Sequence, residues 1–281
     1  MNRLRIKHMT GFHYGGDVTA SYNEARMLPS STDGQLVLYS SLEILPISSQ
    51  HTYVDYWGSR VSSFEILTPH KELALTANSL VEVRPRKHDD QKLSWDDLAA
   101  ASESATSYVE QIAQTRRTAP PPDVAALAAD IAGRAITPCE AALAICTAIG
   151  DAMEYMHGVT AVTSTAAEAW AVRKGVCQDI THIALGALRS VGIPARYVSG
   201  YLHPKPSAEI GETIAGESHA WVEWFCGEWR GFDPTNNIDI GDRHVLVGRG
   251  RDYNDVPPLR GVYAGPYGSE LFVKVEITRE S

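Results

Sequence analysis

A helix that begins at Cys177 is predicted by residues 175–194, which read GVCQDITHIALGALRSVGIP. Gly192 and Pro194 end this helix. Its apolar residues recur at helical spacing as one stripe, formed by Ile180, Ile183, Ala184, Ala187, Leu188 and Val191. A helix N-terminus presents unpaired N–H groups and about half a positive charge, which favours a nucleophilic thiolate. The pattern therefore places Cys177 where a thiol is activated.

A β-hairpin follows, with strands predicted at residues 219–225 and 229–233 and a turn around Gly227. A hairpin centred there pairs residues whose numbers sum to about 454. Asp233 then lies one diagonal step from His219 on the same face of the sheet, and such neighbours are about 7–8 Å apart at Cα. The spacing therefore predicts a carboxylate beside an imidazole.

A cysteine nucleophile needs a base within hydrogen-bond reach and a third group that orients the base. Cys177, His219 and Asp233 supply these three types of side chain, whereas a lone cysteine is most often a small buried hydrophobic residue. His182 lies about 500° around the helix from Cys177, so we interpret it as structural. Asp179 is interpreted as a charge that balances the helix N-terminus.

The rest of the sequence predicts an α+β protein with two domains. Residues 1–83 contain short alternating strands separated by Gly, Pro, Asn and Asp, as in a β sandwich or barrel. The charged segment 84–92 suits a connection between domains. Helices are predicted to begin near residues 95, 123, 138 and 166, and further strands at 195–202 and 271–277. We therefore expect an all-β, sandwich-like domain at 1–88 and a second domain at 94–281.

Composition excludes several classes of protein. The chain has 281 residues and a formal net charge of −9, from 25 basic and 34 acidic residues. An acidic chain without a dense stripe of Lys and Arg is a poor nucleic-acid binder. No segment is long and apolar enough to predict a membrane span or a signal peptide. The four cysteines form no CxxC pair and do not make a disulfide scaffold, so we expect reduced thiols, no metal site and a cytoplasmic location.

Four segments in order resemble the bacterial transglutaminase-like superfamily. They are residues 175–179 (GVCQD), 192–201 (GIPARYVSGY), 219–222 (HAWV) and 233–235 (DPT). The N-terminal half resembles the β domain that precedes this core in bacterial members, at residues 8–14, 23–29 and 69–70. Together the resemblance covers most of the chain.

This resemblance implies a papain-like core, in which a helix with the cysteine packs on an antiparallel sheet that carries the histidine and the aspartate. It makes Cys177 the nucleophile, His219 the general base and acid, and Asp233 the residue that orients His219. The implied chemistry is attack on a carboxamide or peptide carbonyl, through a thioester acyl-enzyme and without a cofactor. The expected partner is a peptide or protein substrate, and the oligomeric state stays open.

The sequence leaves the reaction itself open. We favour a hydrolase, acting as a cysteine protease or amidase, over a transglutaminase that cross-links proteins. Acetyl transfer to small arylamines and a non-catalytic interaction scaffold with the same fold are two further hypotheses. The N-terminal β domain speaks against acetyl transfer to arylamines, and an intact set of Cys, His and Asp speaks against the scaffold.

Two features of the cleft are also predicted. The backbone N–H of Cys177 is one expected donor to the oxyanion, because it lies at a helix start. The second donor is open between Trp170, Gln178 and Tyr155. The polar segment 203–216, rich in Gly and Pro, predicts a mobile loop at the rim of the cleft.

Overall fold

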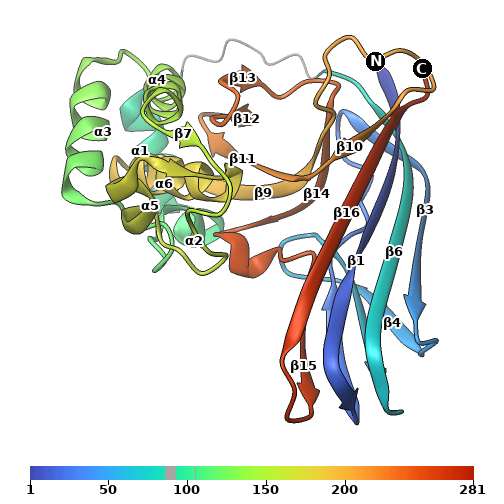
Figure 1. Cartoon of the computed structure of the whole chain (residues 1–281). Coiled ribbons are helices and arrows are strands. Elements are labelled where there is room, and N and C mark those ends of the chain that lie inside the picture. Colours follow the sequence, from blue (N-terminus) through green and yellow to red (C-terminus); the bar gives the residue numbers. More distant parts are fainter. Residues whose placement is uncertain (86–92, 105) are drawn as a thin grey trace.

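The computed structural model describes residues 1–85, 93–104 and 106–281, and it shows a β domain beside a core of helices and strands (Figure 1). The predicted α+β class is confirmed. Most of the predicted connection between the domains, residues 86–92, lies outside the described residues. The two chain termini lie close together at one end of the β domain.

Six strands from the first 83 residues form most of the β domain. They are β1 (Asn2–Val18), β2 (Ala20–Ala25), β3 (Gln35–Leu45), β4 (Gln50–Val54), β5 (Arg60–Ile66) and β6 (His70–Val83). Along β6, Leu73, Leu75 and Ala77 are buried at alternate positions, because successive side chains of a strand point to opposite faces. The N-terminal β domain expected from the sequence is therefore present.

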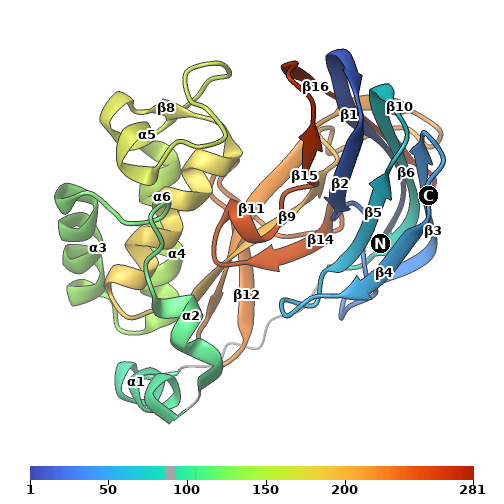
Figure 2. The same cartoon turned by 90° about the horizontal axis from the view of Figure 1, so that it is seen from below.

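Three strands from the second half of the chain complete its two sheets (Figure 2). They are β10 (Thr213–Gly216), β15 (Leu259–Ala264) and β16 (Ser269–Arg279). The larger sheet has the order β10-β16-β1-β6-β3, and the smaller has the order β15-β2-β5-β4. The predicted division into 1–88 and 94–281 therefore does not describe these strands. The pattern of a strand shows which face is buried but not which distant strand it pairs with.

The core is a five-stranded antiparallel sheet with helices on the side away from the β domain (Figures 1 and 2). The helices are α1 (Trp95–Ser104), α2 (Val109–Ile112), α3 (Pro122–Arg134), α4 (Pro138–Asp151), α5 (Ala166–Val172) and α6 (Cys177–Ser190). The sheet strands are β9 (Ala195–Leu202), β11 (Ser218–Phe225), β12 (Trp229–Asp233), β13 (Ile238–Asp239) and β14 (His244–Gly250). Their order is β13-β12-β11-β9-β14. A short parallel pair, β7 (Glu154–Tyr155) and β8 (Lys174–Gly175), lies before α6. None of the described helices is long and apolar enough to cross a membrane.

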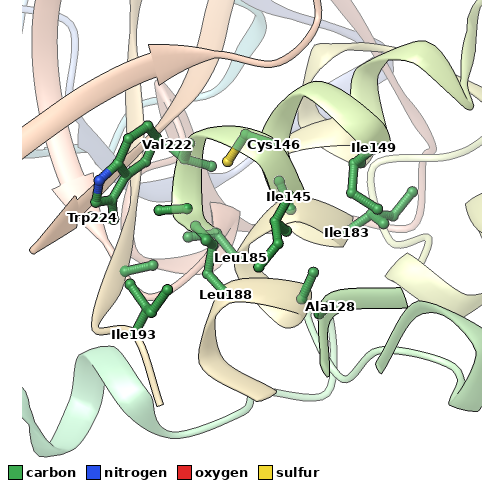
Figure 3. Packing of buried hydrophobic residues seen from close by; sticks show 14 of the residues in the cluster. Ala128, Ile145, Cys146, Ile149, Ile183, Leu185, Leu188, Ile193, Val222 and Trp224 are labelled. Atoms are coloured by element: carbon green, nitrogen blue, oxygen red, sulfur yellow. The ribbon is translucent and has the colours of Figure 1, made fainter. Parts of the chain in front are cut away.

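Helix α6 is held on this sheet by a continuous hydrophobic core (Figure 3). Ile183 and Leu188 of α6 are fully buried, as are Ile145 of α4 and Val222 of β11. Burial of one such side chain contributes roughly 1.5–3 kcal/mol to stability. Because α6 and β11 share this core, the start of the helix has a fixed position relative to the strand.

A disulfide joins Cys139, at the start of α4, to Cys226, in the turn between β11 and β12. Cys146 is a buried free thiol, and Cys177 is free and partly exposed. The expectation of four reduced thiols is therefore wrong for one pair, whose members are 87 residues apart and meet only in the folded chain. The cysteine count gives no support to a cytoplasmic location, which stays a prediction.

We expect the Cys139–Cys226 bond to stabilise the native state, because a long closed loop lowers the entropy of the unfolded chain, an effect of about 2–4 kcal/mol. Cys226→Ser should lower the free energy of unfolding in urea by about this amount. A reductant should lower the wild-type value similarly and leave the variant unchanged. Equal wild-type stability with and without reductant, or a non-reduced mass that shows four free thiols, would contradict this assignment.

Candidate active site

Cys177 is the first residue of α6 and is partly exposed. The carboxylate of Asp179 caps the helix start, where it accepts the backbone N–H of Val176 at 2.9 Å. It also accepts the Thr160 hydroxyl at 2.6 Å, and burial raises the pKa of Asp179. Asp179 therefore stabilises the helix N-terminus, as the sequence predicts, and ties the loop around Thr160 to it.

His219 and Asp233 lie on neighbouring strands in the register that the turn predicts, with Val222 of β11 opposite Phe232 of β12. Nε2 of His219 lies 2.7 Å from Oδ2 of Asp233, and the Asp233 side chain is completely buried. Because Asp233 occupies Nε2, Nδ1 is the ring nitrogen left to interact with Cys177, which contributes to the raised pKa of His219. The structure thus brings the three predicted residues together, with His219 bonded to Asp233 and lining one cavity with Cys177.

The hydrogen bond between His219 and Asp233 shifts their two pKa values in opposite directions. Burial lowers the pKa of His219, but the Asp233 carboxylate and Cys177 outweigh it and raise this pKa to about 10. Burial raises the pKa of Asp233, but hydrogen bonds from His219 and His244 outweigh it and hold this pKa well below its usual range. A protonated imidazole beside an ionised carboxylate is therefore favoured at neutral pH.

Asp233 receives donors on both oxygens. Oδ1 accepts the backbone N–H groups of Thr235 at 3.0 Å and Asn236 at 3.3 Å. Oδ2 accepts the Asn236 side-chain amide at 2.7 Å and also lies 3.5 Å from Nε2 of His244. These contacts hold a buried carboxylate in a single orientation toward His219, because each partner satisfies part of its hydrogen-bonding capacity.

The hydrogen bonds of His244 indicate that the cluster of His219, Asp233 and His244 is a hydrogen-bonded site rather than a metal centre. His219, Asp233 and His244 form the group of described side chains whose ligand atoms lie within 4.8 Å of one another, close enough for a metal ion. However, Nδ1 of His244 accepts the backbone N–H of Gly241 at 3.2 Å, so its proton lies on Nε2 and faces Asp233. A metal-bound histidine instead donates its second N–H. Burial lowers the pKa of His244, which agrees with a neutral ring that donates to the carboxylate.

Cys177 and His219 both line a cavity of about 520 Å³. Tyr155 and Tyr197 form part of its lining, and Val273 and Lys274 of β16 contribute from the β domain. A second cavity of about 420 Å³ includes His219 but not Cys177. The predicted rim segment 203–216 does reach both cavities through Ala215 and Gly216, but its last four residues form strand β10 rather than a loop.

The three candidates for the second oxyanion donor differ in what their polar atoms contact. The indole N–H of Trp170 donates to Asp123 at 2.6 Å, and the side-chain amide of Gln178 donates to the carbonyl of Val162 at 3.1 Å. Tyr155 lines the cavity. Burial, followed by the proximity of Cys177, raises the pKa of Tyr155, so its hydroxyl stays protonated and able to donate. The Tyr155 hydroxyl donates to the exposed Glu217 carboxylate at 3.4 Å, the longest of these three contacts, so Tyr155 is the best placed of the three to donate to a substrate oxygen instead.

The other predicted structural role is confirmed for His182. Nε2 of His182 accepts the backbone N–H of Tyr253 at 3.2 Å, and its ring packs against Tyr197. Burial lowers the pKa of His182 to about 3, so the ring is neutral. It supports the wall of the cavity without facing Cys177.

Two family models match this chain. Residues 4–82 match the bacterial transglutaminase-like N-terminal region, and residues 125–234 match the transglutaminase-like superfamily. The chain belongs to the transglutaminase-like superfamily. The second match spans the start of α6 and the hairpin that carries His219 and Asp233.

Relatives extend this similarity over the whole chain. An uncharacterized protein of Mycobacterium leprae is 40% identical over 279 residues, which cover 99% of each protein. An uncharacterized protein of Mycobacterium tuberculosis is 30% identical over 294 residues, which cover 98% of this chain and 92% of that protein. The crystal structure of a candidate cysteine protease from Cytophaga hutchinsonii aligns with a TM-score of 0.78 and 20% identity, over 100% of this chain and 92% of that one. This last likeness shows a shared fold.

Sequence reasoning missed three residues of the site. Asn236 follows the DPT segment directly, and Glu217, which lines both cavities, precedes His219 by two positions. The sequence neighbourhood of the motifs could therefore have indicated both residues. His244 had none, because it reaches Asp233 from β14, which pairs with β9 through an irregular register.

We expect His219 to stay protonated until about pH 10, because the Asp233 carboxylate and Cys177 together stabilise its cation more than burial destabilises it. Asp233→Asn removes the carboxylate charge, so the pKa of His219 should fall toward or below its ordinary value of 6.5. NMR titration of the His219 ring in both proteins checks this. Titration of wild-type His219 near pH 6.5 would contradict the assigned geometry.

Proposed function

We propose that this protein is a thiol-dependent acyl-transfer enzyme that hydrolyses amide or peptide bonds, as a cysteine peptidase or amidase. One observation carries the proposal. Cys177 begins helix α6 and shares a cavity with His219, whose second ring nitrogen is bonded to the buried carboxylate of Asp233. This is the arrangement of nucleophile, base and orienting group that covalent catalysis requires.

In the first half of the proposed reaction, the Cys177 thiolate attacks the carbonyl carbon while His219 holds the proton. The negative charge moves to the carbonyl oxygen, where the backbone N–H of Cys177 and the Tyr155 hydroxyl are the proposed donors. The C–N bond then breaks, and the departing amine takes the proton from His219. A thioester between the acyl group and Cys177 is left.

In the second half, His219 accepts a proton from a water molecule that attacks the thioester carbonyl. The C–S bond breaks, the carboxylic acid leaves, and the thiol is restored with the proton that His219 returns. The second cavity, which reaches His219 without including Cys177, gives that water a route to the ring. The resemblance in fold to a candidate cysteine protease supports hydrolysis as the main reaction.

A peptide or protein fits the site as a substrate because the two cavities adjoin at His219 and together extend beyond a single amino-acid residue, at about 520 and 420 Å³. Strand β16 supplies one wall of the larger cavity, so the β domain takes part in binding. We propose a cross-linking transglutaminase as the second candidate within the same chemistry, since it differs only in the acceptor of the acyl group.

Turnover of a peptide library, followed by mass spectrometry, tests the proposal. Wild-type protein should release new amino and carboxyl termini or ammonia in the absence of any added amine, and Cys177→Ala should lower the rate by at least about 10³-fold. Product that forms only when a primary amine is present would instead support the cross-linking reaction. Equal activity of wild type and Cys177→Ala would overturn the enzymatic proposal in both forms.

A further inference from the structure

The carboxylate of Glu217 lies where the two cavities adjoin. Glu217 lines both the cavity that contains Cys177 and the one beyond His219. Its side chain is 66% exposed, and it lies two residues before His219, between the end of β10 and the start of β11. The Tyr155 hydroxyl donates to it at 3.4 Å, and Nε2 of His157 lies 3.8 Å away.

The positive charges near Glu217 do not neutralise it. Lys274, which lines the larger cavity, pairs with Glu276 at 2.8 Å. His157 is exposed and carries a charge only when protonated. The lining of the smaller cavity contains no Lys or Arg among the described residues, and Glu217 is its one carboxylate. The protonated ring of His219 also lines this cavity, but its charge is paired with the buried Asp233 carboxylate at 2.7 Å. A ligand in the smaller cavity therefore meets an accessible negative charge beside His219.

The position of this cavity relative to the two reactive groups indicates what it binds. In acyl transfer the departing amine takes its proton from the histidine, so it lies on the histidine side of the nucleophile. The smaller cavity includes His219 and excludes Cys177, which places it on that side. The residue that follows the cleaved bond would enter it.

We propose that the smaller cavity is a subsite for a cationic group on the leaving side of the substrate, and that Glu217 selects it. The chemical class is a lysine or arginine side chain, or a free amine carried by the residue after the cleaved bond. This inference rests on the proposed acyl transfer for the direction of the substrate. A single exposed ion pair is weak in water, but a ligand that fills the cavity displaces water and strengthens the attraction.

The charge itself can be tested without any turnover, by modifying Cys177 with methanethiosulfonates. Cys146 is fully buried and the other two cysteines form a disulfide, so Cys177 is the thiol that reacts. We expect a trimethylammonium reagent to react faster than a sulfonate reagent in low salt. Glu217→Gln should lower this rate ratio by about tenfold, and high salt should lower it in the wild type. Glu270→Gln, an exposed change on β16, is the matched control and should leave the ratio unchanged.

Paired peptides then test the direction of the substrate. A peptide with Lys after the cleaved bond should have a kcat/KM about tenfold above its norleucine analogue, and Glu217→Gln should remove this preference. An unchanged reagent ratio in Glu217→Gln overturns the subsite whether or not the protein turns over peptides. A preference for Lys only before the cleaved bond overturns its place on the leaving side. Absence of all turnover, with a ratio that responds to Glu217→Gln, supports the cation subsite and counts against the proposed function instead.

Discussion

The hydrogen bond between His219 and the buried carboxylate of Asp233 is the interaction on which the rest of the site depends. A carboxylate with no exposed surface is costly unless each oxygen is paired, and here the backbone after β12, Asn236 and His244 pair both oxygens. The same contacts fix the direction from which Asp233 meets His219. The ring is then held in place beside Cys177, with which it lines one cavity.

The fold delivers these groups from elements that share one core. Helix α6 brings Cys177 by its N-terminus, β11 brings His219, and the end of β12 brings Asp233, while buried side chains such as Ile183 and Val222 keep helix and sheet together. The β domain takes part through β16, which pairs with β1 and lines the cavity. Both domains therefore shape the site, although the reactive side chains come from the core alone.

Local rules were enough to predict the central geometry from the sequence. The turn at Gly227 fixes the register of its hairpin, and hence the neighbourhood of His219 and Asp233, while the apolar stripe and Gly192 fix the span of α6. Contacts between segments that are distant in the sequence could not be predicted in this way. The Cys139–Cys226 disulfide, the pairing of β16 with β1, and the approach of His244 to Asp233 each depend on the finished fold. No local pattern of residues encodes them.

The most direct test of the central claim, that Cys177 is the nucleophile aligned by His219 and Asp233, is the intact mass of protein quenched in acid during turnover of an activated ester or amide. We predict one added acyl group, located on Cys177 by peptide mapping, and none on Cys177→Ala. Asp233→Asn should form the same adduct more slowly. Turnover by the wild type with no adduct, or an adduct on another residue that persists in Cys177→Ala, would contradict the account.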